Sequence, residues 1–338
     1  MRPNLTAQKD TAQATRLQDR QKTDPRVYAS LEHLVRLQHQ ATGYSFLPRQ
    51  PVSSLLSGRY ASRLRGRGLN FEELRRYQQG DDIRTMDWKA TARTRRPHVR
   101  VYTEERDRAV LLLVDQRQHM FFGSCERMKS VVAAEAAALA AWRALAVGDR
   151  VGAVVFGDHA MTAIRPRRSK ATVMQVLRTI ETLNHDLRAD ALITDSGPQL
   201  NTALARALRL AGHDSLVVLI SDGQGANDAT TRLTAQLAAH NDMLCIHLYD
   251  PLRASPRAAI GNGAITDGRL QVAVDFGDPH LWDRISGDYR HEIAELKTIY
   301  RKLSAPLIPI NTAEPVVDQI RSWIGSRPGG FATSRRRS

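Results

Sequence analysis

The sequence predicts an α/β protein with a doubly wound, mostly parallel sheet, preceded by an arginine-rich segment that is partly helical and partly extended. Two continuous apolar runs, residues 110–114 and 216–220, have the pattern of strands buried on both faces. Between residues 109 and 325, runs of this kind alternate with segments of helical periodicity. Strands that alternate with helices of this length are typical of a parallel sheet covered on both faces.

Each element follows from the local pattern. A helix is expected to open at Pro25, where the missing N–H costs nothing, and to end near Gly43. Phe71, Leu74 and Tyr77 have the spacing of one face of a short helix. Further helices are expected at residues 128–146, 170–183, 200–210, 230–239, 285–303 and 316–324. Strands are expected at residues 98–102, 110–114, 151–156, 160–164, 216–220, 243–248, 271–274 and 307–310, with 160–164 as the hairpin partner of 151–156.

Composition divides the chain into five segments. Residues 1–24 carry few large apolar side chains and are expected to form a disordered tail, followed by a helix and connector at 25–57. Residues 58–108 are rich in arginine and are called the signature segment below. The α/β domain is expected at 109–325, and residues 326–338, with three terminal arginines, are expected to form a basic disordered tail.

The charge of the chain points to an anionic partner. Its 338 residues carry a net charge of +14, and the sequence pI is about 10.3. Such a balance suits nucleic acid, an acidic membrane surface or an acidic protein face. The basic side chains are densest at residues 59–108, 165–170 and 335–337.

Nothing in the sequence indicates export or membrane insertion. No apolar stretch approaches the roughly 18 to 20 residues that span a bilayer, and the first 24 residues contain no apolar signal region. Cys125 and Cys245 lie far apart in the sequence and suggest neither a disulfide framework nor a metal motif. We therefore expect a cytoplasmic protein.

Two aspartates mark the expected binding crevice. Asp115 and Asp222 each come at the end of one of the buried apolar runs. In open α/β sheets, ligands bind beyond the carboxyl ends of the strands. Both carboxylates should therefore project into the same crevice, unless they only cap strand ends and helix N-termini.

The segment from Gly66 to Arg93, which reads GRGLNFEELRRYQQGDDIRTMDWKATAR, resembles the signature of the bacterial DUF58 family. The stretches GDRVG at 148–152, FGD at 156–158 and YDPL at 249–252 extend the resemblance over most of the chain. Members of this family carry a von Willebrand factor type A (vWA)-like domain after the signature. The resemblance implies a binding module rather than an enzyme.

A vWA domain builds a metal-ion-dependent adhesion site from an Asp-x-Ser-x-Ser sequence, a threonine of a later loop and a second aspartate, which together hold a hard divalent cation. The resemblance maps these positions onto Asp115, Arg117, His119, Thr202 and Asp222. Arg117 and His119 stand where the serines would be. An ion pair at roughly 4 Å is worth about 4 kcal/mol at an effective dielectric of 20, so Arg117 competes with Mg²⁺. We expect no metal cofactor; if an ion binds, Asp115, Thr202 and Asp222 are its expected ligands.

The signature segment carries a second set of candidate binding residues. They are Arg75, Tyr77, Gly80, Asp81, Asp82, Arg84, Asp87, Trp88 and Arg93. The Gly-Asp-Asp sequence is a turn signal, and the Asp-Trp pair leads into a helical stretch. The charged members either form an ion-pair network that fixes the segment to the sheet or present a docking surface for a partner.

By resemblance, the chain is a non-enzymatic protein-interaction module with a degenerate adhesion site. The resemblance further implies an adaptor or co-chaperone of a MoxR-type AAA+ ATPase that acts on a client protein. The net charge leaves direct nucleic-acid binding as an alternative, although only 6% of the residues are aromatic. A second alternative is a metal-dependent hydrolase that uses Asp115 and Asp222. Arg117 argues against it, because a neighbouring guanidinium weakens a carboxylate as a general base.

Overall fold

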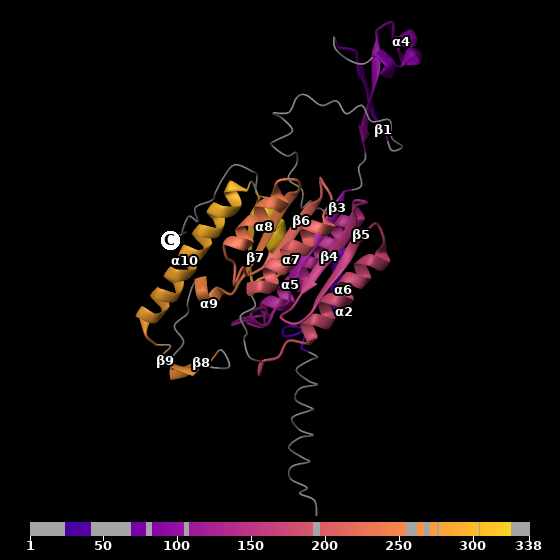
Figure 1. Cartoon of the computed structure of the whole chain (residues 1–338). Helices are drawn as coiled ribbons and strands as arrows, with labels where there is room; N and C mark the ends of the chain where they lie inside the picture. The colour runs from indigo at the N-terminus through magenta and orange to yellow at the C-terminus, as the bar shows by residue number, and fades with distance from the viewer. Residues whose placement is uncertain are drawn as a thin grey trace, which may run out of the picture. The chain divides into compact units, whose positions relative to one another are not determined.

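The computed structural model describes residues 24–41, 69–78, 83–104, 108–191, 197–254, 262–266, 271–275, 277–303 and 305–325. The chain divides into two compact units (Figure 1). Residues 47–107 form the smaller unit, and residues 1–46 together with 108–338 form the larger one. The two predicted tails, except for Asp24, and the second half of the predicted connector lie outside the described residues.

A six-stranded sheet forms the centre of the larger unit, in the order β10-β7-β6-β3-β4-β5. Its strands are β3 (Ala109–Asp115), β4 (Arg150–Phe156), β5 (Met161–Arg167), β6 (Leu216–Ser221), β7 (Asp242–Tyr249) and β10 (Leu307–Asn311). Neighbouring strands are parallel except for β4 and β5, which form an antiparallel pair at one edge. The strand order reverses between β3 and β6, which is the topological switch point of a doubly wound sheet. The predicted fold class is confirmed.

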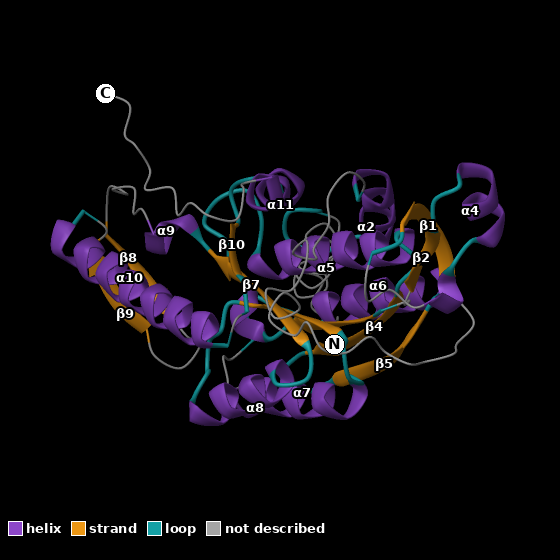
Figure 2. Cartoon of the chain, turned by 90° about the horizontal axis from the view of Figure 1, so that it is seen from above, coloured by secondary structure: helices purple, strands orange, loops and turns teal. Residues whose placement is uncertain are grey.

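Helices cover both faces of this sheet (Figure 2). One face carries α5 (Lys129–Ala146), α6 (Lys170–His185) and α11 (Val316–Gly325), and the other carries α7 (Gly197–Leu210), α8 (Asp228–Ala238) and α10 (Pro279–Lys302). Leu111 and Leu113 of β3 pack in the core beneath α7, whereas Leu112 and Val114 alternate with them and are fully buried on the opposite face. Burial on both faces explains why β3 is an uninterrupted apolar run.

A short N-terminal element packs against α5 and α6. It consists of α2 (Leu31–Arg36) and the 3-10 turn η1 (Leu37–Gln40). The helix expected from Pro25 begins only at Leu31. Side chains of α6 bind the backbone at the start of α2 and oppose its extension toward Pro25. The N–H of Ala29, before the helix, donates to Asn184 Oδ1 at 2.7 Å, and the N–H of Leu31, its first residue, donates to Glu181 Oε1 at 2.7 Å.

The smaller unit contains an antiparallel pair of strands, β1 (Leu69–Arg76) and β2 (His98–Glu104), separated by the 3-10 turn η2 (Ile83–Thr85) and α4 (Trp88–Thr94). The short helix expected at residues 71–77 is therefore wrong. A bulge in β1 explains the misleading spacing, since Phe71 pairs with Tyr102 and Leu74 pairs with Arg100. A three-residue step on β1 thus matches a two-residue step on β2.

The remaining elements are short. They are the 3-10 turn η3 (Gln118–Met120), α9 (Pro251–Ala254) and an antiparallel pair, β8 (Asn262–Thr266) and β9 (Gln271–Asp275). The sequence did not predict β8, because its opening Asn-Gly pair has the pattern of a turn. No helix within the described ranges is long and apolar enough to cross a membrane.

Candidate functional site

A cavity of about 1100 Å³ opens beyond the carboxyl ends of β3 and β6 and is called the crevice below. This is the switch point at which doubly wound sheets bind their ligands. The residues after β3, the loop after β6, the start of α5 and one side of α10 form its walls. Apolar side chains make up much of the lining, among them Phe121, Phe122, Met128, Leu296 and Ile299. His119 and Lys129 line the same cavity.

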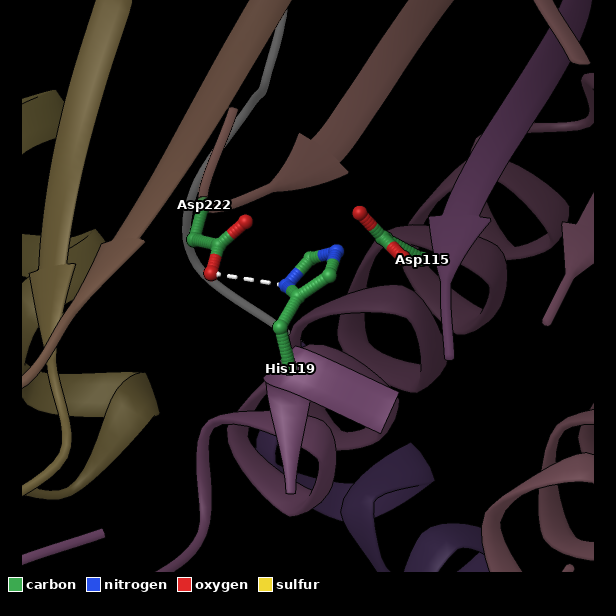
Figure 3. Close-up of side chains that lie close together, drawn as sticks. All are labelled: Asp115, His119 and Asp222. Atoms are coloured by element: carbon green, nitrogen blue, oxygen red, sulfur yellow. Dashed lines mark hydrogen bonds and ion pairs between the residues drawn. The ribbon is translucent and has the colours of Figure 1, made fainter. Parts of the chain in front are cut away.

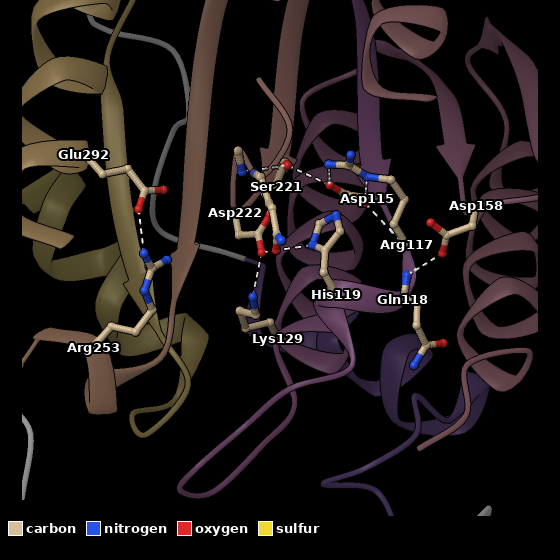
Figure 4. A network of polar contacts seen from close by, with 12 residues as sticks. Asp115, Arg117, Gln118, His119, Lys129, Asp158, Ser221, Asp222, Arg253 and Glu292 are labelled. Carbon is tan, nitrogen blue, oxygen red and sulfur yellow. Dashed lines mark hydrogen bonds and ion pairs between the residues drawn. The ribbon is translucent and has the colours of Figure 1, made fainter. Parts of the chain in front are cut away.

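Arg117 neutralises Asp115 in the interior next to the crevice. Both side chains are fully buried. The Nε of Arg117 donates to Asp115 Oδ1 at 2.9 Å, and a terminal guanidinium nitrogen donates to Oδ2 at 2.6 Å (Figure 4). The hydroxyl of Ser221 also donates to Oδ2, at 2.7 Å. Burial acts to lower the pKa of Arg117, but Asp115, together with Asp222 and Asp158, outweighs this effect and raises that pKa.

Lys129 neutralises the second carboxylate, Asp222, and His119 lies within hydrogen-bond distance of it. Lys129 Nζ donates to Asp222 Oδ2 at 2.5 Å, and His119 Nδ1 lies 3.0 Å from the same oxygen. Figure 3 shows the imidazole of His119 between the two carboxylates. The N–H of Gln224 donates to Asp222 Oδ1 at 3.0 Å. Burial alone would raise the pKa of Asp222, but Lys129 and His119 together hold it well below its usual value.

We call Asp115, Arg117, His119, Lys129, Ser221 and Asp222 the charged cluster. The topology of the sheet brings its members together, because β3 and β6 are neighbours and both aspartates come at their carboxyl ends. Sequence reasoning missed Lys129 and Ser221. A signal for Lys129 was present: it is the first residue of α5, and a helix that follows a central strand begins at the carboxyl edge of the sheet.

Two imidazole nitrogens at the cluster are buried without a hydrogen-bond partner in the described part of the chain, Nε2 of His119 and Nε2 of His247. His247 lies on β7, where it is electrostatically coupled to Asp222 and Lys129. Burial lowers the pKa of His247 to about 4, although Asp222 opposes the shift. His247 is therefore uncharged at neutral pH and adds no positive charge beside Asp222.

Thr202 does not join the charged cluster, so its predicted place in the site is wrong. It lies inside α7 rather than in the loop before it, and its side chain is exposed. The hydroxyl donates to the carbonyl of Pro198 at 2.8 Å, a back-bond to the preceding helical turn. The error came from the helix boundary, since α7 begins at Gly197 and not at Leu200.

The donor set does not fit a site for a hard divalent cation. Asp115, His119 and Asp222 do place one ligand atom each within 4.8 Å of one another. Each carboxylate, however, already accepts hydrogen bonds from a permanent cation, Arg117 or Lys129. Two buried positive charges beside the donors oppose a third cation, and the expected threonine lies elsewhere.

The candidate residues of the signature segment are partly described. Gly80, Asp81 and Asp82 lie outside the described residues. Asp87 is buried and caps α4, accepting a hydrogen bond from the N–H of Ala90 at 2.9 Å. Arg75 lies within β1, and Tyr77 lies directly after it. Arg84 is exposed on η2, and Trp88 and Arg93 are exposed on α4. The structure thus assigns Asp87 a local role in helix capping.

A family model and several known proteins match this chain. The model described as "Protein of unknown function DUF58" matches residues 73–280. The uncharacterized protein Rv1480 of Mycobacterium tuberculosis is 31% identical over 283 residues, which is 83% of this chain and 87% of that protein. The uncharacterized protein Mb1516 of Mycobacterium bovis matches to the same extent.

Three solved structures match part of this chain with low similarity. An aerotolerance-related membrane protein from Bacteroides fragilis matches with a TM-score of 0.36 and 10% identity, covering 64% of this chain and 96% of its own. BatB from Bacteroides thetaiotaomicron also has a TM-score of 0.36 and 10% identity, with coverages of 65% and 100%. A von Willebrand factor type A protein from Catenulispora acidiphila has a TM-score of 0.29 and 12% identity, with coverages of 44% and 35%. These scores are too low to carry any function to this chain.

Proposed function

Because the chain belongs to the DUF58 family, we propose that it is a non-enzymatic protein-interaction module that serves a MoxR-type AAA+ ATPase as an adaptor or co-chaperone for a client protein. The family resemblance of the signature segment supports the choice of partner. The observation that carries the interaction function is the crevice, whose lining joins apolar side chains to charged ones and lies next to a cluster of charges that are already neutralised.

The lining of the crevice supports protein docking. Phe122 is 43% exposed, and further apolar side chains of the same cavity, including Met128 and Leu296, lie around it. Aromatic residues and methionine are enriched at protein interfaces. A cavity of about 1100 Å³ has room for one or two side chains of a partner or for a short segment of its chain.

The charged cluster supports binding rather than catalysis. A general base must be able to accept a proton near the working pH. Asp222 is a poor candidate because its pKa is held well below the usual value, and both oxygens of Asp115 already accept hydrogen bonds. Arg117 and Lys129 provide the positive charge that a metal ion provides in adhesion sites. We therefore expect docking to be independent of metal.

Capture of the ATPase by tagged protein tests this function. We would compare wild type with Phe122→Ala and with Trp323→Ala, whose side chain is a similarly exposed aromatic on α11 that does not line the crevice. Nuclease-treated native lysate with ATP is the source, and mass spectrometry identifies the captured protein. Wild type and Trp323→Ala should recover a stoichiometric AAA+ ATPase, and Phe122→Ala should lose most of it. Absence of any ATPase would refute the partner, and equal capture by all three proteins would refute the crevice as the docking face.

A further inference from the structure

A second concave surface lies at the amino ends of the strands, at the opposite edge of the sheet from the crevice. It is a cavity of about 370 Å³ lined by Arg150, Arg165 and Arg209 together with His213, and we call it the arginine basin. Arg150 is the first residue of β4, and His213 comes shortly before β6. The basin therefore has no residue in common with the crevice.

The basin gathers positive charge without a counter-charge in its lining. No aspartate or glutamate within the described ranges lines it. Arg165 and Arg209 are exposed, and neither forms an ion pair or hydrogen bond with any described residue. Guanidinium groups that share a concavity repel one another unless an anion lies between them. The local arrangement is one that a bound anion would stabilise.

The chain positions Arg165 through a bulge in the edge strand. Val151 pairs with Arg167 and Ala153 pairs with Ile164, so Gly152 alone faces both Arg165 and Pro166. A Cβ at position 152 would lie only 2.6 Å from the nitrogen of Pro166, so this approach requires glycine. Bulges re-aim side chains and are common next to binding sites. Here the bulge contains Arg165, which lines the basin together with Arg150.

The carboxyl end of α7 opposes anion binding here. Arg209 lies in the last turn of this helix, and Leu210 at its end also lines the basin. The end of a helix carries a partial negative charge of roughly half a unit. The two guanidinium charges of Arg165 and Arg209, which have no partner among the described residues, outweigh it. The net field in the basin is therefore positive.

From these observations we propose that the arginine basin binds the phosphate group of an anionic ligand. Guanidinium groups present fork-shaped donors that match phosphate oxygens. A cavity of about 370 Å³ has room for a phosphate ester but not for an element of a folded protein. Exposed Arg167 and Arg168, in the basic stretch after the bulge, extend the positive surface beside the basin. The phosphate belongs either to a free small molecule or to a nucleic-acid backbone.

Calorimetric titration of the full-length protein with pyrophosphate at low salt tests the proposal. The basin variant is Arg165→Ala/Arg209→Ala. The control is Arg178→Ala/Arg232→Ala, which removes the same charge from exposed positions of α6 and α8 outside the basin. Loss of two charged hydrogen-bond donors should weaken binding by at least about tenfold in the basin variant. The control should stay within about twofold of wild type, because only long-range charge is lost.

A competition experiment identifies the source of the phosphate. Displacement of a labelled oligodeoxythymidine by pyrophosphate, with loss of the oligonucleotide in the basin variant, would indicate a nucleic-acid backbone. Saturable pyrophosphate binding without displacement would indicate a small phosphorylated ligand. The proposal is overturned if folded wild-type protein shows no saturable binding of pyrophosphate. It is equally overturned if the two double variants lose binding to the same degree. Circular dichroism checks that every variant is folded.

Discussion

Arg117 is a permanent charge in the protein interior, and Asp115 compensates it through two hydrogen bonds. Removing one partner of a buried ion pair costs roughly 3–5 kcal/mol, whereas replacing both by apolar residues is often neutral. We predict that Arg117→Ala lowers the free energy of unfolding by about 3–5 kcal/mol and that Asp115→Leu/Arg117→Met restores most of it. Urea unfolding followed by circular dichroism measures both. If Arg117→Ala lowers the free energy of unfolding by less than about 1 kcal/mol, the pair behaves as a solvated surface ion pair.

His247 makes the free energy of unfolding depend on pH. Its pKa is about 4 in the folded protein, against 6.5 for the ordinary side chain. Below pH 6.5 the unfolded chain binds a proton that the folded protein does not, so stability is full above that pH and falls as the pH approaches 4. The expected loss between neutral pH and pH 5 is about 2 kcal/mol.

The variant His247→Leu isolates this effect. It should remove the loss between neutral pH and pH 5, because the titrating group is gone. Asp222 does not interfere in this window, since its depressed pKa affects stability only near and below the ordinary pKa of an aspartate, roughly 4. Urea midpoints at several pH values provide the comparison. Identical pH profiles for the two proteins would show that His247 titrates normally.

The sequence predicted four members of the charged cluster but not how they pair. Asp115 and Asp222 could be placed because both end buried strands, and the family resemblance then added Arg117 and His119. Lys129 and Ser221 contact the carboxylates through the packing of α5 and β6; only the position of Lys129 at the start of its helix could have indicated this. Thr202 failed because its role depended on a helix boundary, and helix boundaries are the least certain part of a sequence-based prediction.

At the scale of elements, the edge pair β4–β5 depends on a single glycine. A Cβ on Gly152 would lie 2.6 Å from the carbonyl oxygen of Ile164, which is backbone and cannot move aside cheaply. We predict that Gly152→Ala lowers the free energy of unfolding by about 1–3 kcal/mol. The control is Gly287→Ala in α10, where nothing lies within 4 Å and the change should stabilise the helix by about 0.5–1 kcal/mol. Thermal unfolding compares the two variants. Equal changes in the free energy of unfolding would show that a Cβ at position 152 is not crowded.

The N-terminal element is anchored by Leu34, which is fully buried between α2 and α5. Its carbonyl accepts a hydrogen bond from Trp142 Nε1 at 3.0 Å. Leu34→Ala should lower the free energy of unfolding by about 2–5 kcal/mol, the usual range for replacing a buried leucine by alanine. Tryptophan fluorescence during urea unfolding measures the loss. Should the variant unfold at the wild-type midpoint, the element contributes little to the stability of the larger unit.

The elements that the sequence predicted best are those whose pattern depends on burial alone. The strands β3 and β6 and the helices α5 and α6 appear within a few residues of their expected bounds. The failures involve backbone details that periodicity does not carry. A bulge gave β1 a helical spacing, and side-chain bonds from α6 delayed the start of α2.

At the scale of the whole molecule, the larger unit carries two concave surfaces at opposite edges of one sheet. The crevice at the carboxyl edge joins apolar side chains to a cluster in which Arg117 and Lys129 neutralise two aspartates. The arginine basin at the amino edge keeps its positive charge exposed. The charges of the cluster next to the crevice are thus balanced, whereas no acidic side chain of the described residues lines the basin. One surface suits a protein partner, and the other suits a phosphate.

The central claim is that the carboxylates of the crevice are occupied by the protein's own cations. Calorimetric titration with Mg²⁺ tests it most directly, on wild type and on Arg117→Ser/Lys129→Ser. Wild type should show no saturable binding in the low-millimolar range. The double variant should gain one site, because Asp115, His119 and Asp222 then face the ion without competing charges. Stoichiometric binding of Mg²⁺ by wild-type protein would contradict the account.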